Sequence, residues 1–207
     1  MTMMPDSPSP RPSPARERLL ATASRIFYTE GIHSVGVDKV IAEAQVTRAT
    51  FYRHFSGKED LVRAYLEARD QTYRAMGAQA AQMQIEPGEL LMLMVNGVAD
   101  EVCSPGFRGC PFINAAAEFP DPEHPVRQVV SAHRAWFRDT LESLLAQAGH
   151  PNPDQAVRTL VMLRDGAMVA GYLEDAEQAR LDLVREAAAL AKPAQGNQQI
   201  SRPARLP

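Results

Sequence analysis

Apolar residues recur at helical spacing along most of the chain, and no stretch shows the two-residue alternation of a half-buried strand. The first stripe runs through residues 14–30 and consists of Leu19, Leu20, Ala23, Ile26 and Phe27. Ser13 followed by Pro14 is typical of a helix start, and Gly31 is typical of a helix end. The pattern therefore predicts a first helix over residues 14–30.

The same spacing predicts eight further helices, and hence an all-α protein with about nine helices. Their expected ranges are 37–44, 48–54, about 59 to 82 or 84, 90–102, 112–119, 126–148, 156–173 and 176–191. Ser56-Gly-Lys-Glu59 has the S-x-x-E form of a capping box, and Asn152-Pro153-Asp154-Gln155 combines an N-cap, a first-turn proline and a glutamine at the third position. Pro87-Gly88 is expected to interrupt the helical pattern.

Residues 36–58 are expected to form two short helices with a tight corner at Gln45 and Val46. Phe51 and Phe55 lie four positions apart, so they should share one face and pack inward. The rest of the second helix carries basic and hydroxyl side chains and no acid, namely Arg48, Thr50, Tyr52, Arg53 and His54. A helix of this kind suits the major groove of DNA, although an ordinary solvated basic face is the alternative.

Each polar position has an expected role. Arg48 and Arg53 are the best candidates for contacts to bases or phosphates. The expected phosphate contacts are Thr47, Thr50, Tyr52, His54 and Lys58. His54 has the alternative of a packed, hydrogen-bonded histidine. Lys58 lies where a helix begins, and the free N–H groups there add to an anion site.

Charge is distributed unevenly along the 207 residues. Residues 1–58 hold eight Lys/Arg and five Asp/Glu, whereas residues 59–207 hold fourteen and twenty, so the overall net charge of −3 hides a basic front. This asymmetry favours a protein that touches a polyanion with one end. There is no apolar run of 18 residues and no secretory signal, so no membrane span is expected, and two cysteines indicate a reduced, cytoplasmic protein.

The segment from Val37 to Leu61 resembles the N-terminal domain of the tetracycline-repressor (TetR) family. Its most specific part is Thr50-Phe-Tyr-Arg-His-Phe55 followed by Lys58 and Leu61. Two positions depart from the family pattern: Val35-Gly36 stands where a Thr or Ser is usual, and Gln45 stands where Gly is usual. A phosphate contact before the second helix would then come from backbone N–H groups or from Ser34, and the corner would carry some conformational cost.

The resemblance implies a helix-turn-helix domain over residues 14–62, with Val37 among its DNA contacts, and an effector-binding and dimerisation domain over 63–192. Residues 1–13 and 193–207 are expected to be disordered or flexible tails. It also implies a homodimer on a palindromic double-stranded DNA operator, released by an apolar or amphipathic small-molecule inducer. Repression is the expected outcome, and activation by the same fold is the alternative.

Two residue sets in the body are candidate sites. Adaptable apolar side chains for an inducer pocket are Met92, Phe112, Phe119, Trp136, Met162 and Met168. A self-complementary dimer face is expected from Val161, Asp165, Met168, Val169 and Tyr172, with Gly166 and Gly171 allowing close approach. Plain core packing is the alternative for both sets.

No enzymatic chemistry is predicted, because the sequence has no phosphate-cradling loop, no paired nucleophile and base, and no metal-ligand pattern. We therefore expect no catalytic residues, no cofactor and no metal; the acidic turn around His124 fits no ligand spacing. Cys103 and Cys110 flank a Gly/Pro-rich loop, so a thiol-redox-sensing repressor is a further alternative, against two small buried residues.

Overall fold

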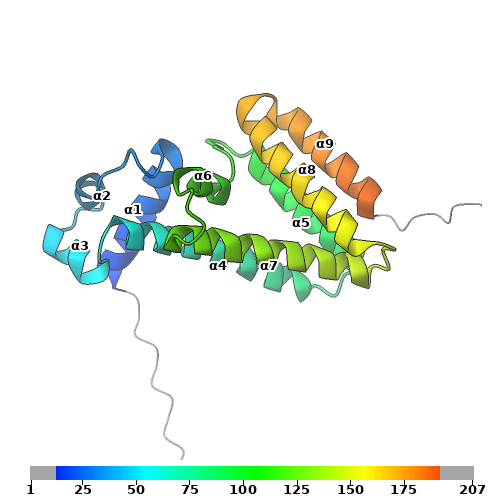
Figure 1. Cartoon of the computed structure of the whole chain (residues 1–207), viewed down its shortest axis with the longest axis horizontal. Helices are drawn as coiled ribbons and strands as arrows, with labels where there is room; N and C mark the ends of the chain where they lie inside the picture. Colours follow the sequence, from blue (N-terminus) through cyan, green and yellow to red (C-terminus); the bar gives the residue numbers. More distant parts are fainter. Residues whose placement is uncertain (1–12, 192–207) are drawn as a thin grey trace, which may run out of the picture. The chain divides into compact units, whose positions relative to one another are not determined.

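The computed structural model describes residues 13–191, so the tails expected at 1–13 and 193–207 lie outside the described residues, except for Ser13. Within that range the chain forms nine α-helices and no strand, which confirms the all-helical prediction. The helices are α1 Pro14–Glu30, α2 Val37–Glu43, α3 Arg48–His54, α4 Lys58–Ala81, α5 Pro87–Val102, α6 Pro111–Glu118, α7 Pro125–Gln147, α8 Pro153–Leu173 and α9 Ala176–Ala191 (Figure 1).

The helix starts agree with those expected from the local sequence, except in two details. Pro87 does not break the chain but occupies the first turn of α5, after Glu86 in an extended conformation, because a missing N–H costs nothing there. At the start of α4 the acid that reaches back is Asp60 rather than Glu59: its Oδ2 accepts from the backbone N–H of Ser56 at 3.0 Å. Asn152 caps α8 as expected, accepting from the N–H of Gln155 at 3.3 Å.

The described residues form two compact units. The first contains residues 13–74 and 111–132, so α6 and the beginning of α7 belong with the helices that precede residue 75. This grouping is discontinuous in sequence, whereas the predicted boundary was a single point between residues 62 and 63. Residues 111–132 thus complete the N-terminal unit, although residues 75–110 separate them from it in the sequence.

The core of the first unit is made by α1, α2 and α3, which pack against one another, together with residues from α4 and α6. Its largest fully buried side chains are Leu19, Ile26, Val35, Val40, Phe51, Leu61, Tyr65, Leu66 and Phe112. Burying one such side chain contributes roughly 1.5–3 kcal/mol. The apolar stripes predicted for residues 14–30 and 37–44 are therefore the faces that meet here.

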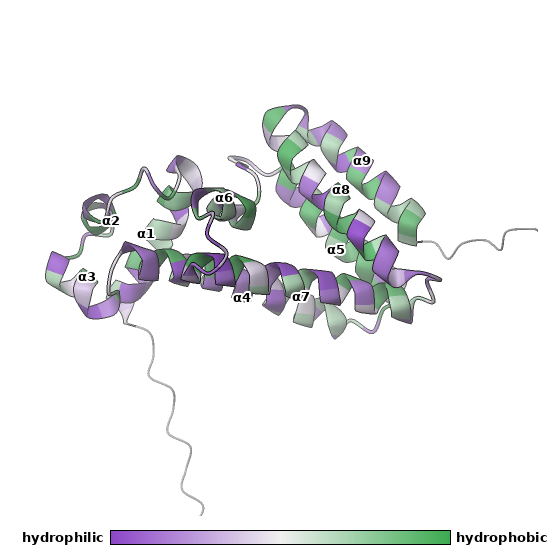
Figure 2. Cartoon of the chain, viewed as in Figure 1, coloured by the Kyte–Doolittle hydropathy of each residue, from purple (hydrophilic) through white to green (hydrophobic). Residues whose placement is uncertain are grey.

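The second unit contains residues 75–110 and 133–191, and α5, α8 and α9 pack together within it. Its core consists of Leu91, Val95, Ala99, Leu141, Leu144, Leu145, Ala156, Val157, Leu160, Ala167, Leu183 and Ala187. Figure 2 shows the apolar residues of this unit along α5, α8 and α9. No helix among residues 13–191 is long and apolar enough to cross a membrane.

One glycine marks a close approach inside the second unit. A Cβ placed on Gly171 of α8 would lie 2.2 Å from Cγ1 of Val102, at the end of α5. No side chain larger than hydrogen fits there unless Val102 moves. The close approach expected at Gly171 is therefore made within the chain, whereas a Cβ on Gly166 would meet nothing within 4 Å.

Candidate nucleic-acid interface

The corner between α2 and α3 is tight and has an unusual backbone. Gln45 adopts φ +53°, the left-handed region that favours glycine. The N–H of Val46 donates to the carbonyl of Ile41 at 3.2 Å, which closes the end of α2. The predicted conformational cost at Gln45 is therefore present, and the chain still makes the turn.

Thr47 fixes the beginning of α3. It is extended, at φ −83° and ψ 156°, and its Oγ1 accepts from the N–H of Thr50 at 3.1 Å, as an N-cap should. The two threonine hydroxyls lie 2.9 Å apart. Thr47 therefore caps α3, and the residue is exposed at the beginning of the helix.

The two faces of α3 are clearly different. Phe51 and Phe55 are buried, with ring centroids 5.9 Å apart, and Arg16 of α1 lies over the Phe55 ring at 5.3 Å. Tyr52 leans on the edge of Phe51 with centroids 5.1 Å apart, while 51% of Tyr52 is exposed. Tyr52 thus packs its ring against the scaffold and keeps about half of its surface exposed.

The two arginines of α3 differ in their surroundings. Arg53 is exposed and has no polar partner within residues 13–191. Arg48 is also exposed but forms an ion pair with Asp38 of α2. Of the two, Arg53 is free to meet a ligand without breaking an internal contact.

His54 and Lys58 have internal partners. His54 Nε2 lies 3.3 Å from the hydroxyl of Ser13, which matches the alternative of a packed histidine. Lys58 donates from Nζ to the carbonyl of His33 at 3.2 Å. Burial lowers the pKa of Lys58, and the nearby Glu118 carboxylate opposes that shift. A phosphate contact by Lys58 must therefore compete with this internal bond.

The connector before α2 has no side-chain cap. Val35 is fully buried, and Gly36 occupies the N-cap position with an extended backbone. The Ser34 hydroxyl donates to the carbonyls of Glu30, at 2.5 Å, and Gly31, at 3.0 Å. Val37 is half-buried at the start of α2. The N–H groups at this helix start remain the donors suited to a phosphate there.

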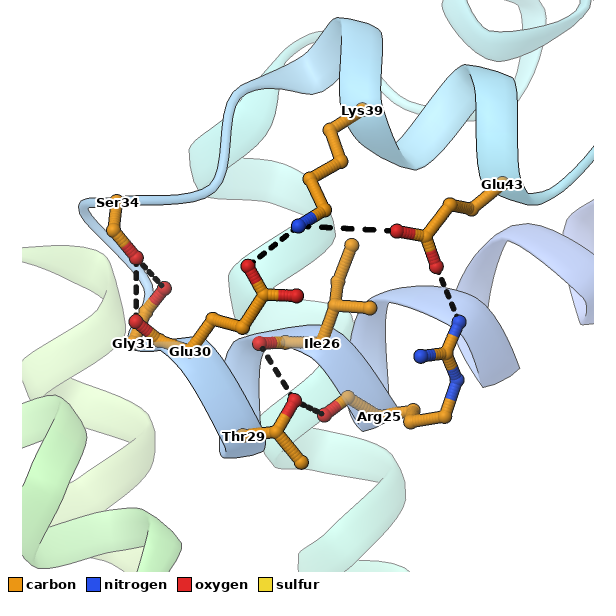
Figure 3. A network of polar contacts seen from close by, with 8 residues as sticks. All are labelled: Arg25, Ile26, Thr29, Glu30, Gly31, Ser34, Lys39 and Glu43. Atoms are coloured by element: carbon orange, nitrogen blue, oxygen red, sulfur yellow. Dashed lines mark hydrogen bonds and ion pairs between the residues drawn. The ribbon is translucent and has the colours of Figure 1, made fainter.

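A chain of charges holds α2 against α1 (Figure 3). Lys39 of α2 lies 2.5 Å from Glu30 and 3.9 Å from Glu43, and Glu43 also pairs with Arg25 of α1. These side chains are partly exposed, so each pair contributes little alone, on the order of 0–1 kcal/mol. Together they connect α2 to α1.

Comparison with known proteins decides the family. A model described as "Bacterial regulatory proteins, tetR family" matches residues 19–65, and one described as "Tetracyclin repressor-like, C-terminal domain" matches residues 91–188. The crystal structure of a TetR-family transcriptional regulator from Streptomyces coelicolor is 52% identical, with a TM-score of 0.83, covering 86% of this chain and 94% of that one. The chain belongs to the TetR family.

Two further relatives of this TetR-family protein are transcription factors. The regulator LmrA of Bacillus subtilis is 25% identical over 138 residues, 65% of this chain and 73% of LmrA. The activator FasR of Mycolicibacterium smegmatis is 38% identical over 52 residues, 25% of this chain and 24% of FasR. The protein is thus a transcriptional regulator with a DNA-binding helix-turn-helix, and the relatives found are regulators rather than enzymes.

The predicted inducer residues of this TetR-family protein belong to both units. Phe112 and Phe119 are buried in the first unit, whereas Met92, Trp136 and Met168 belong to the second. Met162 is 72% exposed. Helical periodicity assigns each residue to a face of its helix, and the inducer set stays a prediction.

The predicted dimer residues lie on α8. Val169 and Tyr172 are each 47% exposed, and Val161 and Asp165 are half-buried. Met168 is 1% exposed, so in the single chain it packs inward. Sequence reasoning missed Met162 and Leu173 as exposed members of the same helix, at 72% and 68%.

The two cysteines have different environments. Cys103 is exposed, with Sγ 3.4 Å from the carbonyl of Ala176 and 3.6 Å from the Glu177 carboxylate. Local desolvation, followed by Glu177, raises the pKa of the Cys103 thiol, which disfavours a reactive thiolate. Cys110 is buried and accepts a hydrogen bond from Arg164. No cluster suited to a metal ion occurs within residues 13–191.

Proposed function

We propose that this TetR-family regulator is a homodimeric repressor that binds a pseudo-palindromic operator and is released from it by a small-molecule inducer. The observation that carries the proposal is the presentation of α3: its apolar side is buried by Phe51 and Phe55, and its other side exposes Arg53 and Tyr52. A recognition helix held in this way reads base edges with its exposed side chains.

A dimer is supported by the exposed apolar residues of the second unit. Met162, Val169, Tyr172 and Leu173 on α8, with Leu181 on α9, leave an apolar surface exposed in the single chain. A two-fold axis would let the same surface cover itself, and two recognition helices would then meet two half-sites one helical turn apart. V169D should convert the protein to a monomer in sedimentation experiments, with L93D on α5 as the control.

The test of the whole proposal starts from operator selection with genomic DNA fragments, followed by footprinting. We expect a protected site with two-fold symmetry and a steep loss of affinity as salt is raised. Transcription of a reporter downstream of that site should fall when the protein is present. An asymmetric site bound by one subunit would contradict the proposed dimer. Reporter transcription that rises instead would contradict the proposed repression.

Release by an inducer is tested separately on the same operator. A compound that binds the protein should raise its melting temperature, because binding to the folded state stabilises it. An inducer should also weaken DNA binding in the same concentration range. DNA binding that no bound compound alters would favour a constitutive regulator.

A further inference from the structure

The beginning of α1 is joined to the end of α3 within the first unit. The hydroxyl of Ser13, the residue before α1, lies 3.3 Å from Nε2 of His54, the last residue of α3. About one turn further along α1, the guanidinium of Arg16 lies over the ring of Phe55, 5.3 Å from the ring centroid. Phe55 directly follows α3 and is buried. The first turn of α1 is therefore held against the C-terminal end of the recognition helix.

The guanidinium of Arg16 is held in place but has no acceptor inside the protein. Arg16 is half-buried, and the face of the Phe55 ring attracts its positive charge. Among residues 13–191, no carboxylate or other hydrogen-bond acceptor pairs with it. Glu17 is the next residue, but successive side chains of a helix point about 100° apart. An arginine that is positioned by a ring and keeps its N–H donors unused is suited to bind an anion.

The surroundings of Arg16 favour a polyanion as its partner. The last turn of α3 carries Arg53 and His54, and α3 contains no acid. Arg16 comes from α1 and lies at the end of α3, beside Phe55, rather than along the exposed side of α3. When α3 lies in the major groove, its end points toward the edge of that groove, where the phosphates of the backbone are found.

We propose that Arg16 binds a phosphate of the DNA backbone at the edge of the groove that α3 enters. This inference rests on the proposed operator binding by α3 and adds a contact from outside the helix-turn-helix. A guanidinium donates two N–H groups to one phosphate, and such contacts fix the register of a protein on DNA without reading its sequence. Ser13 and His54 have a positioning role, because their contact keeps α1 and α3 together.

The experiment compares R16M with R158M in the full-length protein. Methionine keeps an unbranched apolar side chain against Phe55 and removes the charge. Arg158 is exposed on α8, pairs with Asp154 and belongs to the second unit, so R158M is the charge-matched control. Fluorescence anisotropy measures affinity for the selected operator and for a random duplex at several salt concentrations. For each bound subunit, R16M should weaken binding to both duplexes about 5- to 10-fold at about 0.1 M salt, and R158M should match the wild type.

Two further readouts identify a phosphate as the partner. The slope of log affinity against log salt should become shallower by about 0.9 for each bound subunit in R16M. In an ethylation-interference experiment, one phosphate in each half-site should weaken binding of the wild type when it is ethylated, and R16M should be insensitive to ethylation there. R16Q repeats these measurements if R16M fails to fold.

An affinity and a salt slope in R16M equal to those of R158M would overturn the proposal. A loss confined to the operator would also overturn it, because Arg16 would then contact a base rather than a phosphate. The failure of the proposed operator binding has a different signature. Equal affinity of the wild type for operator and random duplex, with a shallower salt slope in R16M, would contradict the operator and support the phosphate contact of Arg16.

Discussion

The carboxylate of Glu118, at the end of α6, accepts a hydrogen bond from the backbone N–H of His33 at 2.5 Å. The same oxygen, Oε2, lies 3.3 Å from Nδ1 of His33, and the other oxygen, Oε1, accepts from the N–H of Ile32 at 2.9 Å. From the opposite direction Lys58 donates to the His33 carbonyl. The connector between α1 and α2 is thus held by one acid from α6 and one base from α4.

Replacing Glu118 should loosen the DNA-binding unit. E118A leaves two backbone N–H groups without their acceptor, so the free energy of unfolding should fall by about 1–2 kcal/mol. Operator affinity should fall as well, because α2 begins directly after this connector. Urea unfolding and fluorescence anisotropy measure the two effects. E118Q, which keeps one acceptor oxygen, should lie between, and E123A in the exposed turn after α6 should match the wild type.

Removing Arg53 should weaken DNA binding without affecting the fold. Its side chain has no internal partner in the described part of the chain, so R53A should leave the melting temperature unchanged. A specific contact to a base contributes about 1–3 kcal/mol, which predicts operator binding roughly 5- to 150-fold weaker. A gel-shift titration checks this, with R158A as the control. Unchanged affinity would mean that Arg53 does not face the DNA.

Asp38 should restrain DNA binding through Arg48. The ion pair between them is exposed, so its loss changes stability little. D38N removes an acid from the DNA-facing unit and frees Arg48, so affinity for any DNA should rise. The slope of log affinity against log salt should steepen by about one phosphate contact. D154N, which breaks a similar pair on α8, should change neither quantity.

Two glycines of α8 should respond in opposite ways to alanine. G171A places a methyl group 2.2 Å from Val102, and overpacking of this kind costs about 1–3 kcal/mol. The double variant G171A/V102A should recover part of that loss. G166A meets nothing within 4 Å in the single chain and should stabilise the helix by roughly 0.4–1 kcal/mol. Dimer dissociation in G166A would instead place Gly166 against the second subunit.

Asp165 should contribute stability that disappears in acid. Burial alone would raise the pKa of this carboxyl, but hydrogen bonds from Arg134 and Arg164 outweigh burial and lower it. A carboxyl whose pKa is lowered by folding stabilises the folded state at pH values above its unfolded-state pKa, about 3.9. This stabilisation is lost as the pH falls through the folded-state pKa. D165N should therefore lower the free energy of unfolding at pH 7 and converge on the wild type toward pH 3. An equal loss at both pH values would exclude this charge-based account.

Local patterns accounted for the helices and for most of α3. The spacing of Leu19, Ala23 and Ile26 identified the buried face of α1, and Gly31 identified its end, because periodicity and capping depend on residues within one or two turns. The S-x-x-E motif at Ser56 pointed to the right helix start but the wrong acid, since Asp60 is the residue that reaches back. Which of the two acids reaches back depends on a single side-chain rotamer.

Contacts between distant segments could not be obtained in the same way. Glu118 and His33 are 85 residues apart, and nothing in the composition of either segment marks them as partners. In the same way, nothing in the residues around Lys58 indicated that its Nζ would donate to the His33 carbonyl. The burial of the Arg164 side chain and its unpartnered Nε also arise only on folding, so sequence patterns did not mark this residue.

The discontinuous first unit limits how the protein can be divided or recombined. A chimera that transplants only residues 13–74 onto another regulator would leave Glu118 behind, and Ile32 and His33 would lose their acceptor. Exchange of DNA specificity between relatives should therefore succeed when residues 111–132 travel with the helix-turn-helix. The unit that can be exchanged consists of two pieces of chain, and its junctions lie within α4 and α7 and just before α6.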